Sequence, residues 1–323
     1  MRRREFITLI GSAAVTWPFA STAQEAGRTY RVGILMPYPR DHPPNLAFYD
    51  GLRRRGFIEG QNLTIDYRDF AQHGDLISEY AAQLVKSQPD ALYVGGGLAI
   101  RAAQKATKTI PILGVTDDMV GEGLVDSMTR PGRNTTGVSI LATELNGKRQ
   151  DILIEAVPGL RRMGALGDSN TTTEADFRAL QETARTHGIE LSIHRVAKGE
   201  EVAAAIDMAQ ASGATALNVL ASPMLYANHQ LIMERVAALR MPAIYQWPEM
   251  AEEGGFAAYG PRLTRLPDLV ARLVSNLLRG TKPADLPIEQ PTEFELVINL
   301  KTAKALGFSI PETLLVRADE VIE

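Results

Sequence analysis

Short apolar runs rich in β-branched residues alternate with stretches of helical spacing along most of the chain. The first set of runs covers residues 31–36, 63–67, 91–94, 112–115 and 137–140. Strands that alternate with helices are typical of a parallel sheet, because each parallel neighbour needs a crossover connection that is usually a helix. This pattern predicts an α/β fold and excludes all-α and all-β architectures.

Helical spacing is clearest between the second and third runs. One apolar face there is formed by Leu76, Ile77, Tyr80, Ala81 and Leu84, and Pro89 follows its end. Gly56 and Gly188 each precede an apolar residue at the end of a helical stretch, so we expect both to terminate helices.

A second set of strands follows a predicted helix at residues 145–157, which Pro158 and Gly159 end. Its apolar runs cover residues 163–166, 191–196, 216–220 and 243–245. A further run at 255–259, a long helix and a Pro-rich stretch at 282–291 follow, and we expect this tail to cross back to the first lobe and out again. Two open sheets place a ligand cleft at the carboxyl ends of their strands.

The first twenty-three residues predict export. Arginines at positions 2, 3 and 4 precede a short apolar stretch, residues 7–19, which ends at Ser21-Thr22-Ala23. The stretch is too short to span a bilayer, so we expect cleavage near Ala23, a mature start near Gln24 and a periplasmic location. Arg3 and Arg4 also fit a twin-arginine signal, and the choice between that route and the Sec route stays open.

Composition limits the classes of partner and chemistry. Removing residues 1–23 discards three Arg and one Glu, which takes the net charge from −4 to −6. A mildly acidic protein argues against a nucleic-acid partner. The 323 residues include no cysteine, so neither disulfides nor thiolate chemistry is expected.

Catalytic and metal motifs are weak. Gly167-Asp168-Ser169 follows a predicted strand and is similar to a hydrolase nucleophile block, but no Asp-x-x-His follows to supply a base for Ser169. The five histidines show no metal-site spacing, and Gly95-Gly96-Gly97 lacks the rest of any nucleotide-binding motif. We expect no metal, no cofactor and no enzymatic activity, and we interpret the glycines as a tight turn that presents backbone N–H groups to a ligand.

The C-terminal region resembles a known family. The sequences are GTKPADLPIEQPT at 280–292, FELVINLKTAKALG at 294–307 and ADEVIE at 318–323, together with RPGRNTTGVS at 130–139. This pattern is similar to that of ABC-transporter substrate-binding proteins, the branch that includes relatives binding aromatic amino acids, and the similarity covers essentially the whole mature chain.

The resemblance implies the type I periplasmic-binding-protein fold, with two Rossmann-like lobes joined by three crossovers. The N-terminal lobe would comprise residues 30–141 and 257–288, and the C-terminal lobe 142–256 and 289–323. The implied function is the capture of a small solute, an aromatic or other amino acid or an aromatic carboxylate, by a monomer. The implied partners are a membrane permease and its ATPase subunit.

Two cleft loops depart from the family pattern and leave the solute open. Relatives usually carry an Asn-Pro type turn where this chain has GDSNTTT at 167–173. After Asp117 they favour Pro-Val-Gly, where this chain has Asp118-Met119-Val120-Gly121.

The loops that follow the strands supply the candidate ligand-binding residues. The first lobe contributes Tyr38, Gly96, Gly97, Thr116, Asp117 and Asp118, and the second contributes Ser169, Asn170, Thr171, Ser222, Tyr245, Gln246 and Trp247. Hydroxyls and helix N-terminal N–H groups suit a carboxylate, one Asp suits an ammonium, and aromatic rings suit an apolar body. Each residue also has a structural interpretation, such as Asp117 or Asp118 capping a helix.

Other classes remain open at this point. A ligand-sensing receptor without transport would share the same features, and a hydrolase would need Ser169. A transcription regulator of the same architecture would carry an N-terminal helix-turn-helix where this chain has an export signal.

Overall fold

The computed structural model describes residues 27–70, 73–141 and 143–323. The predicted export signal, including Arg3, Arg4, Ala23 and Gln24, lies outside these residues. None of the helices in the described part is long and apolar enough to cross a membrane.

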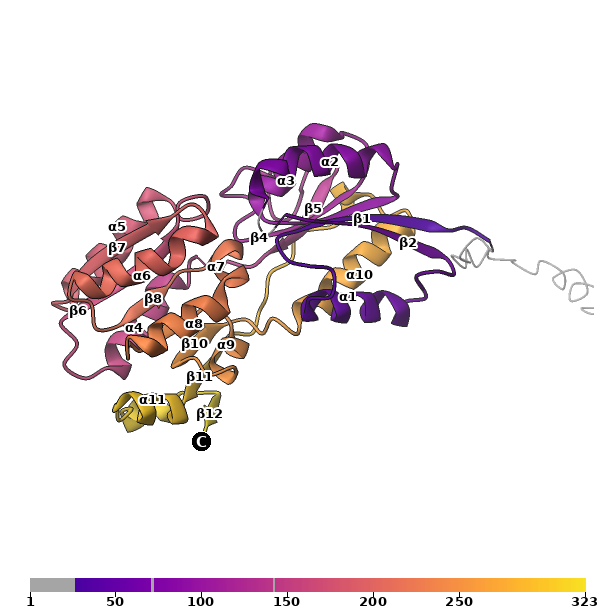
Figure 1. Cartoon of the computed structure of the whole chain (residues 1–323). Helices are drawn as coiled ribbons and strands as arrows, with labels where there is room; N and C mark the ends of the chain where they lie inside the picture. Colours follow the sequence, from indigo (N-terminus) through magenta and orange to yellow (C-terminus); the bar gives the residue numbers. More distant parts are fainter. Residues whose placement is uncertain (1–26, 71–72, 142) are drawn as a thin grey trace, which may run out of the picture.

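The first lobe is a parallel sheet with helices on both faces. Its strands have the order β2-β1-β3-β4-β5 and are β1 (Tyr30–Met36), β2 (Leu63–Asp69), β3 (Ala91–Gly95), β4 (Ile112–Thr116) and β5 (Thr135–Ser139). Helices α2 (Ile77–Lys86) and α3 (Gly97–Ala106) cover one face, and α1 (Pro43–Arg54) and α10 (Leu266–Leu278) cover the other (Figure 1). This arrangement buries the apolar runs on both sides, which explains why they are continuous rather than alternating.

The second lobe is built on a sheet of seven strands in the order β12-β11-β10-β9-β8-β6-β7. These are β6 (Arg162–Asp168), β7 (Glu190–Val196), β8 (Leu217–Val219), β9 (Ala243–Tyr245), β10 (Ala257–Gly260), β11 (Glu295–Asn299) and β12 (Glu320–Ile322). Only the pair β10–β11 is antiparallel among the described strands.

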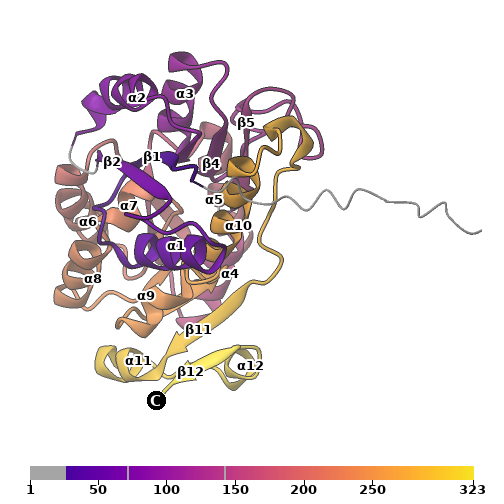
Figure 2. The same cartoon turned by 90° about the vertical axis from the view of Figure 1, so that its right-hand side faces the viewer.

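Helices surround this second sheet. They are α4 (Asn146–Ala156), α5 (Glu174–Thr186), α6 (Val202–Ala211), α7 (Pro223–Ala227), α8 (His229–Ala238), α9 (Pro248–Glu252), α11 (Leu300–Leu306) and α12 (Glu312–Leu315). Helix α4 packs against α5, and α6 packs against α8. The C-terminal elements β11, α11, α12 and β12 form the far edge of the lobe (Figure 2).

The elements agree with the sequence pattern. Each predicted apolar run overlaps a strand, the predicted helix at 145–157 is α4, and the two predicted helix-terminating glycines, Gly56 and Gly188, have φ values of 88° and 68°. These positive φ values are easily adopted only by glycine, so both helices end where the sequence predicts.

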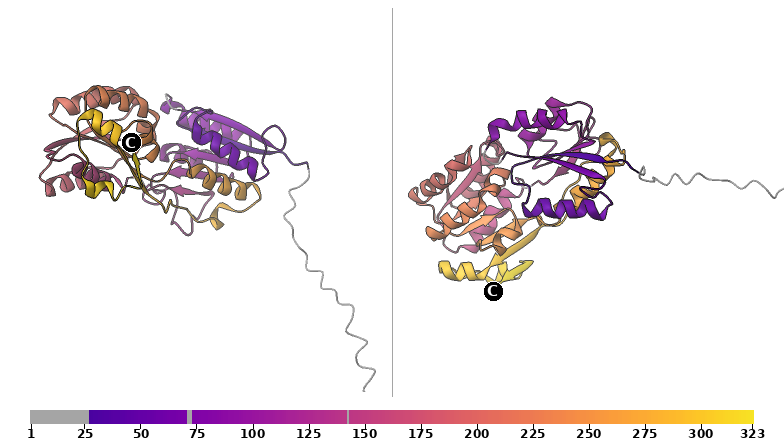
Figure 3. Two further views of the ribbon diagram at one scale, coloured as in Figure 1. Left: turned by 90° about the horizontal axis from the view of Figure 1, so that it is seen from below. Right: turned by 45° about the vertical axis from the view of Figure 1, so that its right-hand side comes forward.

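Three chain segments pass between the lobes: between β5 and α4, between β10 and α10, and before β11 (Figure 3). The expected return to the first lobe at residue 257 is wrong, because residues 257–260 form β10, which pairs with β9 and β11 of the second sheet. The expected exit before residue 289 is also wrong. Glu289 still runs beside β5, where its N–H donates to the Gly137 carbonyl at 3.0 Å.

Candidate ligand-binding site

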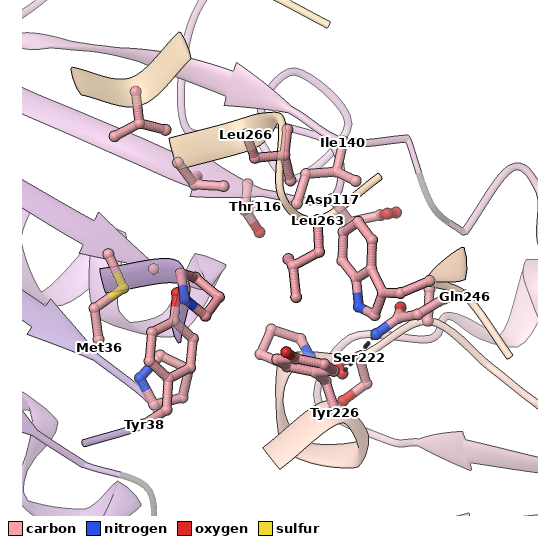
Figure 4. A pocket seen from close by; sticks show the side chains of 18 of the residues that line it. Met36, Tyr38, Thr116, Asp117, Ile140, Ser222, Tyr226, Gln246, Leu263 and Leu266 are labelled. Carbon is pink, nitrogen blue, oxygen red and sulfur yellow. Dashed lines mark hydrogen bonds between the residues drawn. The ribbon is translucent and has the colours of Figure 1, made fainter. Parts of the chain in front are cut away.

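A cavity of about 100 Å3 lies between the lobes, at the carboxyl ends of strands from both sheets. From the first lobe it is lined by Met36, Pro37, Tyr38, Pro44, Tyr93, Gly95, Val115, Thr116, Asp117, Ile140, Leu263, Leu266, Pro267 and Val270. From the second lobe it is lined by Thr171, Ala221, Ser222, Pro223, Tyr226, Gln246 and Trp247. Figure 4 shows Met36 and Tyr38 on one side and Ser222, Tyr226 and Gln246 on the other.

Aromatic rings form much of the wall. The Tyr226 and Trp247 rings meet edge to face, with centroids 6.2 Å apart at 72°. Burial raises the pKa of Tyr38 to about 12, so its phenol stays protonated at neutral pH. The cavity therefore suits a flat apolar group more than a polyhydroxylated one.

One carboxylate, that of Asp117, lies in this apolar wall. Its Oδ1 accepts a hydrogen bond from the Thr143 N–H at 2.8 Å, and its Oδ2 accepts one from the Thr143 hydroxyl. These bonds fix the carboxylate at the end of β4. Arg149 is fully buried, interacts electrostatically with Asp117, and donates to the Tyr259 carbonyl at 2.9 Å and to Asn146 Oδ1 at 2.7 Å.

Burial disfavours the positive charge of the Arg149 guanidinium. Burial lowers the pKa of Arg149 to about 9, and the negative charge of Asp117 opposes that shift. The buried arginine and the cavity carboxylate thus stabilise each other's charges.

The two cavity hydroxyls at strand ends are already used by the protein. Thr116 donates to Glu122 Oε1 at 2.7 Å, and Ser222 donates to the buried Asp168 Oδ2 at 2.7 Å. The Ser222 oxygen also accepts from the Met224 and Leu225 N–H groups, so it caps α7. Neither hydroxyl proton is available to a ligand in this arrangement.

A larger chamber of about 570 Å3 adjoins the cavity and shares Pro37, Gly95, Thr171 and Pro223 with it. Gly96, with φ of 89°, makes the expected tight turn before α3. The space beside Gly97 is filled by Glu122, whose Oε2 is only 1.7 Å from where a Cβ on Gly97 would be. The pKa of Glu122 is raised, because the effect of burial exceeds the opposing effect of the hydrogen bond from Thr116.

The structure divides the predicted ligand-binding residues into three groups. The cavity brings together Tyr38, Thr116, Asp117, Thr171, Ser222, Gln246 and Trp247. Gly96, Gly97 and Asn170 line the larger chamber. Asp118, Ser169 and Tyr245 line neither space.

The last three residues lie outside both spaces for local reasons. Asp118 caps the turn that follows it, because its Oδ1 accepts from the Val120 and Gly121 N–H groups. Tyr245 ends β9 and points into the core, where it is 1% exposed. Ser169 is exposed, and no histidine in the described residues hydrogen-bonds to it.

Sequence reasoning missed most of the apolar wall. The missed residues include Met36, Tyr93, Ile140, Tyr226, Leu263 and Leu266. Met36 and Ile140 stand at the ends of predicted strands, so strand-end position alone was a usable signal for them. Tyr226 lies in the short helix α7, where nothing in the local sequence marks it.

No group of three or more potential metal-ligating side chains comes together anywhere in the described ranges.

Comparison with known proteins identifies the family. A family model described as ABC transporter substrate binding protein matches residues 44–322. The chain belongs to this family. Family members are substrate-binding proteins and not enzymes, and the protein is accordingly a binding protein of this class.

Individual relatives agree. The tyrosine-binding protein of Clostridioides difficile is 26% identical over 284 residues, which cover 85% of this chain and 80% of the relative. A conserved domain protein from Vibrio cholerae has a TM-score of 0.82 at 26% identity, over 91% of this chain and all of that one. A Streptococcus pneumoniae ABC domain in complex with L-Trp has a TM-score of 0.80 at 24% identity, over the same shares. The fold is that of type I periplasmic binding proteins.

Proposed function

We propose that the protein captures an aromatic amino acid between its lobes and delivers it to the permease and ATPase of an ABC import system. One observation supports this proposal above all: the interlobe cavity combines a single carboxylate, Asp117, with aromatic and aliphatic walls. No Lys, Arg or His of the described chain lines it. An ammonium group suits Asp117, and an aromatic side chain suits the rings.

This composition favours an amino acid over an aromatic carboxylate that lacks an amine. Such an anion would meet Asp117 with no cationic side chain to offset the repulsion. A sugar is disfavoured as well, because Thr116 and Ser222 already donate their protons to Glu122 and Asp168. The names of two relatives, one tyrosine-binding and one in complex with L-Trp, agree with the proposed class.

Capture would proceed by lobe closure. Asp117 comes from the first lobe and Trp247 from the second, so a ligand that contacts both stabilises the closed arrangement by its differential affinity. The permease would then distinguish occupied from empty protein by shape. We further propose that the protein acts as a monomer in the periplasm after cleavage of its export signal near Ala23, which intact-mass measurement of the secreted form tests.

Isothermal titration with tyrosine, tryptophan and phenylalanine tests the solute class. We expect binding of at least one of them and none of 4-hydroxyphenylacetate or glucose. Asp117→Asn should weaken binding by about ten- to a hundredfold, because it removes a charge-assisted hydrogen bond. Asp118→Asn changes the neighbouring carboxylate outside the cavity and should leave affinity within about twofold. Tight binding of 4-hydroxyphenylacetate would refute the amine requirement.

A further inference from the structure

The indole N–H of Trp247 is a buried donor with no acceptor. Trp247 lines the cavity and is only 5% exposed, and its Nε1 has no hydrogen-bond partner among the described residues. Its backbone is fixed at the start of α9, where Pro248 occupies the first helical position. A buried N–H without an acceptor is costly and uncommon in native proteins, so this one needs an acceptor from elsewhere.

Two hydroxyls that the sequence pattern offers for a ligand carboxylate are already occupied. The Thr116 hydroxyl donates to Glu122, and the Ser222 hydroxyl donates to Asp168. The Glu122 carboxylate fills the space beside Gly97 at the first turn of α3, so a second anion there would meet like charge. The cavity lining holds no basic side chain from the described residues.

We propose that the Trp247 indole N–H donates a hydrogen bond to the carboxylate of the bound amino acid and so selects for it. This inference rests on the proposed function. Asp117 from the first lobe takes the ammonium group, and Trp247 from the second lobe takes the carboxylate. The two ends of one α-amino acid thereby connect the lobes.

A neutral donor has a consequence for specificity. An indole N–H donates to an acceptor oxygen and supplies no counter-charge, so it can donate to an amide carbonyl in place of a carboxylate. A primary amide of the amino acid should therefore keep the contact at reduced strength, whereas the decarboxylated amine has no oxygen to offer and loses the contact entirely.

Titration of one ligand series against two forms of the protein tests this assignment. The ligands are phenylalanine, phenylalaninamide and phenethylamine, which share the ring and the ammonium group. The forms are the unmodified chain and Trp247→Phe, which keeps an aromatic ring and removes the donor. Tyr245→Phe is the matched control, since Tyr245 lies on the same segment and outside the cavity.

We expect Trp247→Phe to weaken phenylalanine about tenfold or more, and phenylalaninamide about two- to tenfold. Phenethylamine should bind both forms equally. A similar loss for all three ligands would assign Trp247 to ring packing alone and overturn the proposal. Tyrosine is titrated as a fourth ligand. If Trp247→Phe weakens tyrosine but not phenylalanine, the N–H bonds to the phenol oxygen, and the proposal is also overturned. If no ligand of the series binds the unmodified chain, the proposed function fails, and this inference fails with it.

A second measurement keeps the test valid if Trp247→Phe does not fold. The chain has two tryptophans, Trp17 and Trp247. In a Trp17→Phe chain labelled with 15N, the single indole N–H resonance belongs to Trp247. It should move downfield when phenylalanine is added and much less when phenethylamine is added. Equal shifts with the two ligands would contradict a hydrogen bond to the carboxylate.

Discussion

Arg149 is a buried cation that interacts electrostatically with the cavity carboxylate. It is fully buried, donates to Asn146 and to the Tyr259 carbonyl, and faces the charge of Asp117. A buried acceptor that loses a charged donor pays the cost of its own burial. Removal of Arg149 should therefore cost stability, whereas the Thr143 bonds hold Asp117 in place.

Arg149→Met should lower the free energy of unfolding by about 3–5 kcal/mol, because two hydrogen bonds from a buried, charged donor, to the Tyr259 carbonyl and to Asn146, are lost. Urea denaturation followed by circular dichroism measures the change. Arg161→Met is the control: Arg161 is exposed, and its replacement should cost less than about 0.5 kcal/mol. Equal effects of the two substitutions would show that burial of Arg149 carries no electrostatic role.

His42 couples the lobes through aromatic contacts. Its ring stacks on Tyr38 of the same lobe at 4.6 Å and meets the edge of Tyr226 of the second lobe at 5.7 Å. Burial lowers the pKa of His42, electrostatic repulsion from His229 lowers it further, and Asp41 raises it. The folded protein therefore favours neutral His42.

This shift fixes the sign of a pH dependence. The pKa of His42 in the folded protein lies below the ordinary value of 6.5, so protonation of His42 destabilises the folded state. This destabilisation is absent well above pH 6.5 and grows as the pH falls below it. Thermal midpoints measured from pH 7.5 to 5 should fall less steeply for His42→Gln than for the unmodified protein. His73→Gln, at an exposed histidine, should leave the slope unchanged. An unchanged slope in His42→Gln would contradict the assignment.

At the scale of elements, β10 supports the loop that carries two cavity residues. Gly260 ends β10, and a Cβ added there would lie 2.0 Å from the Gln246 carbonyl oxygen. The strand and the loop thus leave no room for a side chain at position 260. The loop's position, and with it that of Gln246 and Trp247, depends on this glycine.

Gly260→Ala should destabilise the protein by about 1–3 kcal/mol through overpacking, and should weaken amino-acid binding because the loop must move. Thermal denaturation and titration with tyrosine measure the two effects. Gly147→Ala is the control, since a Cβ at this position in α4 meets nothing within 4 Å. It should be neutral or slightly stabilising. A Gly260→Ala protein of normal stability and affinity would refute the packing argument.

The sequence predicted elements better than it predicted side-chain directions. Strand-end position was enough to predict that Asp117 and Trp247 line the space between the lobes, because parallel strands bring their carboxyl ends to one edge. It did not separate Asp117 from Asp118, since adjacent loop residues point different ways. Tyr245 was misplaced because a strand residue faces either the core or the cleft, and the short run 243–245 gives no alternation to decide between them. The boundary at residue 257 failed because a strand's own sequence does not say which sheet it joins.

At the scale of the whole molecule, the prediction concerns shape. If tyrosine or phenylalanine contacts both lobes, small-angle scattering should show a smaller radius of gyration at saturation. Asp117→Ala and Trp247→Ala, one contact from each lobe, should each reduce the contraction at a fixed ligand concentration. Asp118→Ala serves as the control. A tightly bound ligand that leaves the scattering profile unchanged would place the site within one lobe.

The discontinuous lobes also determine when the protein can fold during its synthesis. Helix α1 is covered by α10, and Arg54 of α1 bonds to Asp268, which comes 214 residues later. Phe48 and Leu52 share their core with Val270 and Val274. The sheet of the second lobe likewise includes β11 and β12, which come last among the strands. The first lobe therefore stays incomplete until α10 has been made, and the second until β12 has been made, so the N-terminal lobe cannot finish folding before most of the second lobe has been synthesised.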